Sequence, residues 1–222
     1  MAINMAMTAD GKTASPERKL TTFGSEVDTD HLFKLRSQFD GVMCGARTID
    51  LNDFTLETGG PRFESMRRRN KLQPHHQRIV VSGSASLSPE SSLFESSPAP
   101  IILCSARASK KNIQRLQSKG ATIVQTGDKS IDFTSALITL RKKHRIRTLL
   151  VEGGGTLNDA LIRADLVERL HLTICPLIMT GQDSCTIADG LGFPTLADAS
   201  IWRLESKRLV KNEIFLTYAR AR

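Results

Sequence analysis

The sequence predicts an α/β protein with a mostly parallel sheet. Six short apolar runs rich in β-branched residues lack polar alternation, as strands buried on both faces do, and helical patterns separate them. The last third changes rhythm, because its final two predicted strands have no strong helix between them and meet in an antiparallel hairpin at Lys211-Asn212. We expect strands over residues 3–7, 41–44, 78–81, 101–104, 122–124, 148–151, 169–175, 202–207 and 214–218.

Helices are expected between the strands. The first covers residues 26–39, with Ser25 as its N-cap and Asp28 three residues later. Others are expected over residues 109–119, from Asp132 and from Thr156. The Ser- and Pro-rich stretch 82–100 is predicted to be a surface loop, because strands of the same character flank it. We therefore expect one domain over residues 1–222.

The charge balance favours anionic partners. The 222 residues include 31 Lys and Arg against 23 Asp and Glu, a formal net charge of +8. The basic clusters 67–69 and 141–145 contain no aromatic residue for base stacking, so we interpret them as solvated faces and expect no nucleic acid partner. A basic nucleic-acid-binding module remains the alternative from a different functional class.

The four cysteines share no CxxC or His-paired spacing, so we expect neither a metal site nor a disulfide framework. The sequence shows no secretory leader and no apolar run of about 18 residues. We expect a cytoplasmic protein without a membrane partner, or a plastid stromal one if a transit segment has been removed.

The stretch Ala6–Thr13, AMTADGKT, ends like a triphosphate-binding loop. Such a loop needs a glycine five residues before Gly-Lys and a helix directly after it, because the helix N-terminus supplies the amides that hold the anion. Ala6 occupies the glycine position, and residues 14–19 contain no apolar helical pattern. Lys12 therefore needs another role.

The stretch Thr148–Ala160, TLLVEGGGTLNDA, has a strand that ends in Glu152, then three glycines, then a helix. Glycines permit a sharp turn and let a ligand approach the main-chain amides at a helix N-terminus. A bound diphosphate and a tight turn without a ligand both fit this pattern. It is not the GxGxxG dinucleotide motif.

Taken together, the motifs resemble the reductase domain of riboflavin biosynthesis, whose members have a dihydrofolate-reductase-like, three-layer α/β/α fold. The order of the matches covers nearly the whole chain. The chain departs from the family pattern at Phe54, at Gly181-Gln182 and in lacking the usual arginine, for which Arg62 is the nearest stand-in. The matches are Asp10-Gly11-Lys12, Leu35-Arg36, Gly45 and Thr48, Asp53 and Leu56, Val151–Gly154, and Cys175-Pro176.

The resemblance implies an NADPH-dependent enzyme that reduces the ribosylamino group of a pyrimidine 5′-phosphate to a ribitylamino group. It also implies a homodimer and a separate deaminase in the pathway, because the zinc deaminase motif is absent here. Lys12, Asp53 and Glu152 are then the catalytic candidates. Asn4, Asp53, Leu56, Arg62 and Glu152 are the expected substrate-binding residues.

The cofactor residues implied by the resemblance lie after several strand ends. Arg107 is expected near the 2′-phosphate, where charge-assisted hydrogen bonds favour NADPH over NADH. The full expected set is Gly45, Ala46, Thr48, Ser82, Gly83, Ser105, Arg107, Gly153, Gly154, Gly155, Thr156 and Leu157.

Three further expectations follow. The lysine corner at Lys12 and the glycine corner behind Glu152 should open onto one crevice. A dihydrofolate or pterin reductase on the same fold is the runner-up, and it is disfavoured because Glu26 and Asp28 are expected to cap the first helix rather than grip a ring. His75 and His76, in a Pro-flanked polar loop, are expected at the surface.

Overall fold

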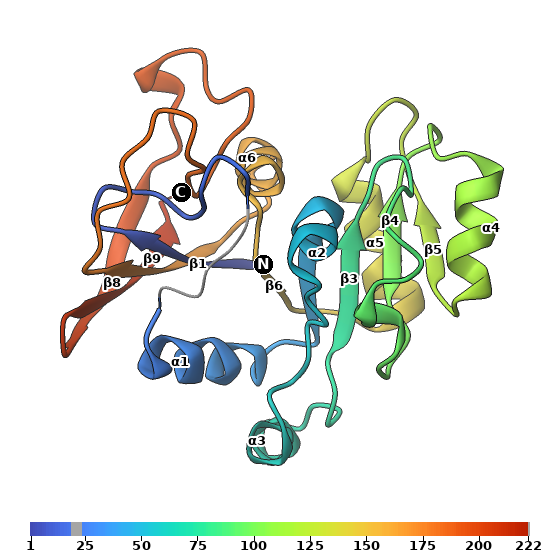
Figure 1. The fold of residues 1–222 in the computed structure, drawn as a ribbon, viewed down its shortest axis with the longest axis horizontal. Helices are drawn as coiled ribbons and strands as arrows, with labels where there is room; N and C mark the ends of the chain where they lie inside the picture. Colours follow the sequence, from blue (N-terminus) through green and yellow to red (C-terminus); the bar gives the residue numbers. More distant parts are fainter. Residues whose placement is uncertain (19–23, 222) are drawn as a thin grey trace. The chain divides into compact units, whose positions relative to one another are not determined.

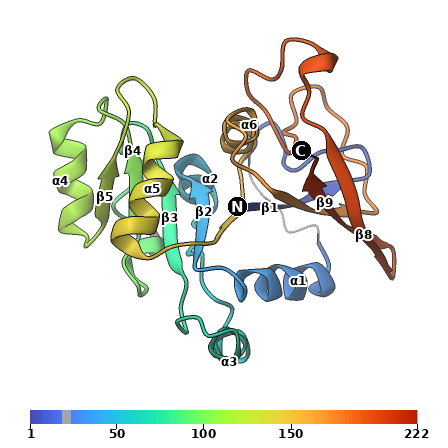
Figure 2. The same cartoon turned by 180° about the vertical axis from the view of Figure 1, so that it is seen from behind.

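The computed structural model describes residues 1–18 and 24–221. The chain divides into two compact units, one made of residues 1–32 and 151–222 and the other of residues 33–150. Figure 1 and Figure 2 label most of the helices and strands of both units. The single domain expected from the sequence stays a prediction, and each unit is described by itself.

The first unit carries a mixed set of strands. Strand β1 (Ala2–Thr8) pairs in parallel with β7 (Arg169–Cys175), which pairs antiparallel with β9 (Glu213–Arg220). Strands β8 (Trp202–Val210) and β9 form the predicted hairpin, with Lys211 in the left-handed region at φ 53°. Helix α6 (Gly155–Arg163) and the short 3₁₀ helix Leu196–Asp198 complete this unit.

The second unit is a parallel α/β arrangement. Strands β2 (Gly41–Gly45), β3 (Gln77–Val81), β4 (Ile101–Cys104) and β5 (Thr122–Gln125) pair in the order β5-β4-β3-β2, all parallel. The predicted class, mostly parallel α/β with antiparallel C-terminal strands, is confirmed. The remaining elements are α2 (Ala46–Asn52), α3 (Pro61–Arg69), the 3₁₀ helix Ser92–Phe94, α4 (Lys110–Ser118) and α5 (Phe133–His144), while α1 (Glu26–Arg36) and β6 (Leu149–Val151) span the division.

Burial follows the apolar runs in the second unit, with one exception. In the first unit, residues 4–7 of β1 are only half-buried, so the expectation of burial on both faces is wrong there as well. The central residues of β2, β3 and β4 are buried on both faces, as predicted; Val42, Ile79 and Ile102 have no exposed surface. In β5 both Thr122 and Gln125 are exposed. The expectation of full burial is wrong for β5 because this strand ends the order and pairs with β4 alone.

The helix signals in the sequence are mostly confirmed. The hydroxyl of Ser25 accepts from the amides of Val27 and Asp28 at 3.1 and 3.4 Å, an N-cap for α1. The helix ends at Arg36, three residues earlier than predicted. Helix α3 was not predicted; it begins with Pro61 after Gly60, whose φ of 94° favours glycine.

Three arginines are buried in the second unit, Arg36, Arg67 and Arg78, and all three donate to carbonyl groups. Arg67 is 1% exposed and donates to the carbonyls of Gln73, Arg36 and Phe39, each at 2.7 Å. Burial lowers its pKa to about 10. The interpretation of residues 67–69 as a solvated face is therefore wrong at Arg67, because only tertiary structure supplies these carbonyls.

Arg78 fixes the 82–100 segment. It is 2% exposed and donates to the carbonyls of Leu93 at 2.7 Å and Thr55 at 3.2 Å, and also to those of Ser96 and Pro98. The segment is thus tied to the core, with Leu93 itself fully buried, rather than being only a surface loop.

His76 is also buried, at 1% exposure, and its Nε2 lies 2.8 Å from the carbonyl oxygen of Leu56. Desolvation, with the nearby Arg36, Arg67 and Arg78 charges, lowers its pKa to about 3. The surface expectation is wrong for His76, whereas His75 is exposed.

We predict that Arg78→Met lowers the free energy of unfolding by at least about 3 kcal/mol, because one buried and three partly buried carbonyls lose their donor. Denaturant unfolding checks this, with exposed Arg69→Met as the matched control, expected within about 0.5 kcal/mol of the parent protein. Equal stability of both variants would contradict the role given to Arg78.

Candidate functional site

The lysine corner is a tight, hydrogen-bonded turn after β1. The amide of Thr8 donates to the Lys12 carbonyl at 2.8 Å, and the amide of Lys12 donates to the Thr8 hydroxyl at 2.9 Å. Gly11 has φ 82°, which favours glycine there. The backbone of Lys12 is thereby fixed at the carboxyl end of β1, where the resemblance placed it.

Asp10 ties this turn to a second segment. Its carboxylate accepts from the Thr8 hydroxyl at 2.5 Å and from the amides of Met179 and Thr180 at 3.1 and 2.7 Å. These hydrogen bonds, with that of Thr8 the largest, lower the pKa of Asp10 to about 2. The Asp-Gly-Lys motif therefore has a structural basis: Asp10 holds the turn that presents Lys12.

The glycine corner after β6 depends on two glycines. Gly153 has φ 83°, and the peptide bond between it and Gly154 is cis. A Cβ on Gly155 would lie 2.7 Å from a carboxylate oxygen of Asp189 and 2.9 Å from the Thr186 carbonyl oxygen. The positive φ requires a glycine at 153, and the close approach of Asp189 and Thr186 requires one at 155. Glu152, which is half-buried, precedes both glycines.

Helix α6 begins at this corner. Its N-cap, Gly154, offers no side chain to the first amides of the helix. Asn158, in its second turn, has no exposed surface; its Nδ2 donates to the Ile187 carbonyl at 2.8 Å, and its Oδ1 is buried with no hydrogen-bond partner in the described structure. The uncapped amides and the positive end of the helix dipole suit an anion.

The two corners contact the same segment, residues 184–189. The amide of Thr13 donates to the Cys185 carbonyl at 2.8 Å, and its hydroxyl donates to the Thr186 carbonyl at 3.2 Å. Gly155 and Asn158 contact Thr186 and Ile187, as described above. The structure thus brings the lysine and glycine corners together in the first unit, and the crevice expected between them stays a prediction.

An acidic pair lies at the same edge, and the sequence analysis missed its significance. The register pairs Thr8 with Cys175 and Ile174 with Ile214, which places Glu213 beside the carboxyl end of β7. Glu213, 5% exposed, accepts from the Ser25 amide at 2.8 Å and from the Ser25 hydroxyl at 2.5 Å.

Asp28 is the second member of this pair. Desolvation raises its pKa, and the charge of Glu213 adds to the effect, while a hydrogen bond from Thr173 opposes it. Asp28 was expected to cap α1; that expectation is wrong, because Ser25 caps the helix and Asp28 is turned toward β7. Its position three residues after a Ser N-cap was visible in the sequence, but its partial burial depends on residues far along the chain.

Cys175 is buried against the same acids, and its Sγ lies 3.9 Å from Oε1 of Glu213. Desolvation and the two carboxylates raise the pKa of this thiol to about 12. Cys175 therefore stays protonated and is no nucleophile.

In the second unit, Ser82, Gly83, Ser105 and Arg107 come together as predicted. The hydroxyl of Ser105 donates to the Gly83 carbonyl at 2.9 Å, and the Arg107 amide donates to that hydroxyl at 3.4 Å. Ser82 and Ser105 are buried and use their hydroxyls within the turns. Arg107 is exposed, so it is the member of this group whose side chain is free to reach a phosphate.

The predicted residues at α2 are largely packed. Gly45 is the N-cap of α2, Ala46 is 8% exposed, and the Thr48 carbonyl accepts from Asn52 at 3.0 Å. Their cofactor role stays a prediction.

Asp53, Leu56 and Arg62 have structural contacts of their own. Asp53 has φ 48° and accepts from the Ser92 amide at 2.9 Å and from the Ser92 hydroxyl at 2.5 Å, and these bonds lower its pKa. Leu56 is 2% exposed, and Arg62 lies over the ring of Phe63 at 5.0 Å. The substrate contacts expected of these three residues stay predictions. Because the side chain of Leu56 is buried, it packs in the core.

Asn4, the remaining predicted substrate residue, lies on β1, and its Oδ1 is buried with no hydrogen-bond partner in the described structure. Across residues 1–18 and 24–221 no cluster of three His, Cys, Asp or Glu side chains could hold a metal. No helix in the same ranges has the length and hydrophobicity to cross a bilayer.

Comparison with curated proteins gives near full-length matches. A 2,5-diamino-6-ribosylamino-4(3H)-pyrimidinone 5′-phosphate reductase from Methanothermobacter thermautotrophicus is 31% identical over 206 residues, which covers 93% of this chain and 90% of the relative. A protein of the same name from Archaeoglobus fulgidus is 27% identical over 191 residues, 86% of each chain.

Solved structures agree on the fold. A pyrimidine reductase-like protein from Corynebacterium diphtheriae has a TM-score of 0.83 at 19% identity and covers 100% of this chain and 91% of its own. A dihydrofolate reductase from Enterococcus faecalis has a TM-score of 0.52 at 13% identity and covers 100% and 96%. The predicted dihydrofolate-reductase-like fold is confirmed.

The family model described as the RibD C-terminal domain matches residues 1–210. Since this match spans nearly the whole sequence, the chain belongs to the RibD C-terminal domain family, as its ordered motifs predicted.

Proposed function

We propose that this chain is an NADPH-dependent reductase of riboflavin biosynthesis that converts the ribosylamino group of a pyrimidine 5′-phosphate to a ribitylamino group. The observation that carries the proposal is the joining of the lysine corner and the glycine corner by the segment 184–189. The excess positive charge suits a cofactor and a substrate that both carry phosphate.

The relatives matched along nearly their whole length support a diaminopyrimidinone substrate, because that ring is in their name. Reduction would then precede deamination, and a separate protein would supply the deaminase. The homodimer implied by the resemblance stays a prediction.

The cofactor's chemistry is hydride donation, and the protein's task is to bind and orient. The residues present fit such a group, because the amides at the start of α6 have no side-chain cap and would donate hydrogen bonds to a diphosphate. The exposed Arg107 matches a 2′-phosphate by charge and by its planar donor geometry.

Lys12 and Glu152 are the proposed catalytic residues of the first unit. The Thr8 and Asp10 hydrogen bonds hold the Lys12 backbone, which supports a role for its ammonium in binding substrate oxygens. Glu152 and Asp53 would bind ribityl hydroxyls as carboxylates, and either one can relay a proton.

Asp28 adds a proton source that the motif analysis did not include. Reduction of the opened sugar imine delivers hydride to carbon and requires a proton at nitrogen. A carboxyl group whose pKa is raised keeps its proton to higher pH than an ordinary aspartic acid, which suits a general acid. We therefore propose Asp28 as the donor or as the last member of the relay that supplies the proton.

We predict that the wild type oxidises NADPH with the diaminopyrimidinone substrate and that Glu152→Gln lowers kcat by about 10²-fold or more, because the carboxylate is lost without a change in size. Nicotinamide absorbance measures both rates. Exposed Glu90→Gln is the matched control, and the aminouracil substrate and dihydrofolate are comparators. Unchanged turnover of the Glu152 variant would remove this residue from the site, and faster reduction of dihydrofolate would contradict the function.

We predict that kcat falls as pH rises through the raised pKa of Asp28, and that Asp28→Asn is slow and lacks this limb. The effect on stability has its own sign. A carboxyl whose pKa is higher in the folded state than its ordinary value of 3.8 makes the folded protein less stable as pH rises from 3.8 through the folded pKa. At neutral pH the Asp28→Asn variant should therefore be no less stable than the wild type. Rate–pH profiles beside thermal unfolding check both points. A pH profile of the variant with the wild-type shape would exclude Asp28 as the donor.

We predict that Arg107→Gln raises the KM for NADPH by about tenfold and leaves the KM for NADH unchanged, because only NADPH carries the phosphate that this guanidinium would bind. The NADH arm is the internal control for folding. An equal change for both cofactors would place the 2′-phosphate elsewhere.

A further inference from the structure

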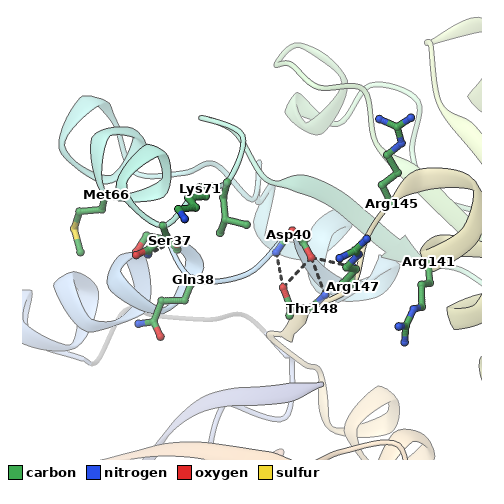
Figure 3. A pocket seen from close by; sticks show the side chains of 11 residues that line it. Ser37, Gln38, Asp40, Met66, Lys71, Arg141, Arg145, Arg147 and Thr148 are labelled. Carbon is green, nitrogen blue, oxygen red and sulfur yellow. Dashed lines mark hydrogen bonds between the residues drawn. The ribbon is translucent and has the colours of Figure 1, made fainter.

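A cavity of about 980 Å³ lies in the second unit, and none of the predicted site residues lines it. It occurs at the amino ends of β2 and β6, since Asp40 directly precedes one and Thr148 the other. Figure 3 shows its lining: Ser37, Gln38, Asp40, Met66, Asn70, Lys71, Leu72, Arg141, Arg145, Arg147 and Thr148.

Four cations line the cavity, and they come from two separate segments. Lys71 follows α3, Arg141 lies in the last turn of α5, and Arg145 and Arg147 belong to the connection between α5 and β6. All four are exposed. In the part of the chain that the structure describes, none of the four side chains forms an ion pair.

Asp40 is the one acidic residue in the lining, and its carboxylate is already engaged. Its Oδ2 accepts from the Arg147 amide at 2.8 Å, the Thr148 amide at 2.9 Å and the Thr148 hydroxyl at 3.0 Å. Asp40 thus fixes the backbone of the basic connection and leaves the guanidinium of Arg147 unneutralised. Four cations against one carboxylate give the lining a formal charge of +3.

Stabilisation of a helix C-terminus accounts for only part of this charge. Cations in the last turn of α5 interact favourably with the helix dipole, which explains Arg141. Arg145 is the C-cap of α5, with φ 59°, so it also lies at this helix end. Lys71 follows the C-cap of α3, in another segment, and Arg147 lies two residues beyond the C-cap of α5. No single helix end therefore accounts for all four cations.

The spacing of the cations indicates the kind of ligand. In Figure 3 the side chains of Arg141 and Arg145 extend in different directions. Lys71 lies on the opposite side of Asp40 from Arg147. Several separated cations suit several linked anionic groups better than a single one. Arginine binds phosphate oxygens in a planar, two-pronged geometry.

The cavity's size and lining distinguish a small ligand from a nucleic acid. Its volume matches small-molecule sites, which span about 300–1,000 Å³. No aromatic side chain lines it, so it offers no surface for base stacking. We propose that this cavity binds a small molecule that carries a chain of phosphate groups, at a site separate from the reductase chemistry.

Isothermal titration with inorganic tripolyphosphate at fixed ionic strength tests the proposal. The cavity variant is Arg141→Gln/Arg145→Gln/Arg147→Gln, and the matched control is Lys110→Gln/Lys111→Gln/Lys129→Gln, which removes three exposed charges from the same unit. We expect Kd to rise at least about tenfold in the cavity variant and to stay within about twofold in the control. Lys71→Gln alone, outside α5, should weaken binding in the same direction if the triple variant folds poorly.

Three outcomes would overturn the proposal. Unchanged binding in the cavity variant would place tripolyphosphate elsewhere, such as at the proposed dinucleotide site, and titration of NADPH-saturated protein identifies that case. Equal weakening in both triple variants would reduce the effect to overall charge. Tighter binding of a short RNA or DNA duplex than of tripolyphosphate, lost in the cavity variant, would assign the surface to nucleic acid instead.

Discussion

The candidate site of the first unit depends on the backbone carbonyl of Thr186. This oxygen accepts a hydrogen bond from the Thr13 hydroxyl, and it lies 2.9 Å from the position that a Cβ on Gly155 would occupy. Any side chain at residue 155 would push the segment 184–189 away and with it the strand-like contact between Ala14 and Cys185. Gly155 of the glycine corner and Thr13 beside Lys12 therefore both depend on the position of the Thr186 carbonyl.

Two aspartates at this edge have pKa values that are shifted in opposite directions. Asp10 is surrounded by donors, so its charged form is favoured, whereas Asp28 is desolvated beside Glu213, so its neutral form is favoured. Such a separation of pKa values assigns different roles to chemically identical groups. Asp10 acts as an anchor, and Asp28 has the properties of an acid.

Local signals in the sequence were sufficient for most of the fold. Residues 169–175 form a strand with the predicted bounds, and Ser109 and Asp132 cap α4 and α5 because their short side chains reach the amides three residues away. The glycine and lysine corners were also readable, since tight turns require particular residues. The burial of Arg67 and His76 and the partial burial of Asp28 were not, because each depends on carbonyls or charges supplied by segments distant in sequence.

Thiol chemistry offers a consequence of this arrangement. All four cysteines are reduced; Cys44, Cys104 and Cys175 are buried, and Cys185 alone is half-exposed. Burial raises the pKa of Cys104 as well as that of Cys175, which slows both toward electrophiles. A single maleimide fluorophore would therefore attach at Cys185 in the native protein, on the segment that joins the two corners, and would report ligand arrival there without an engineered attachment point.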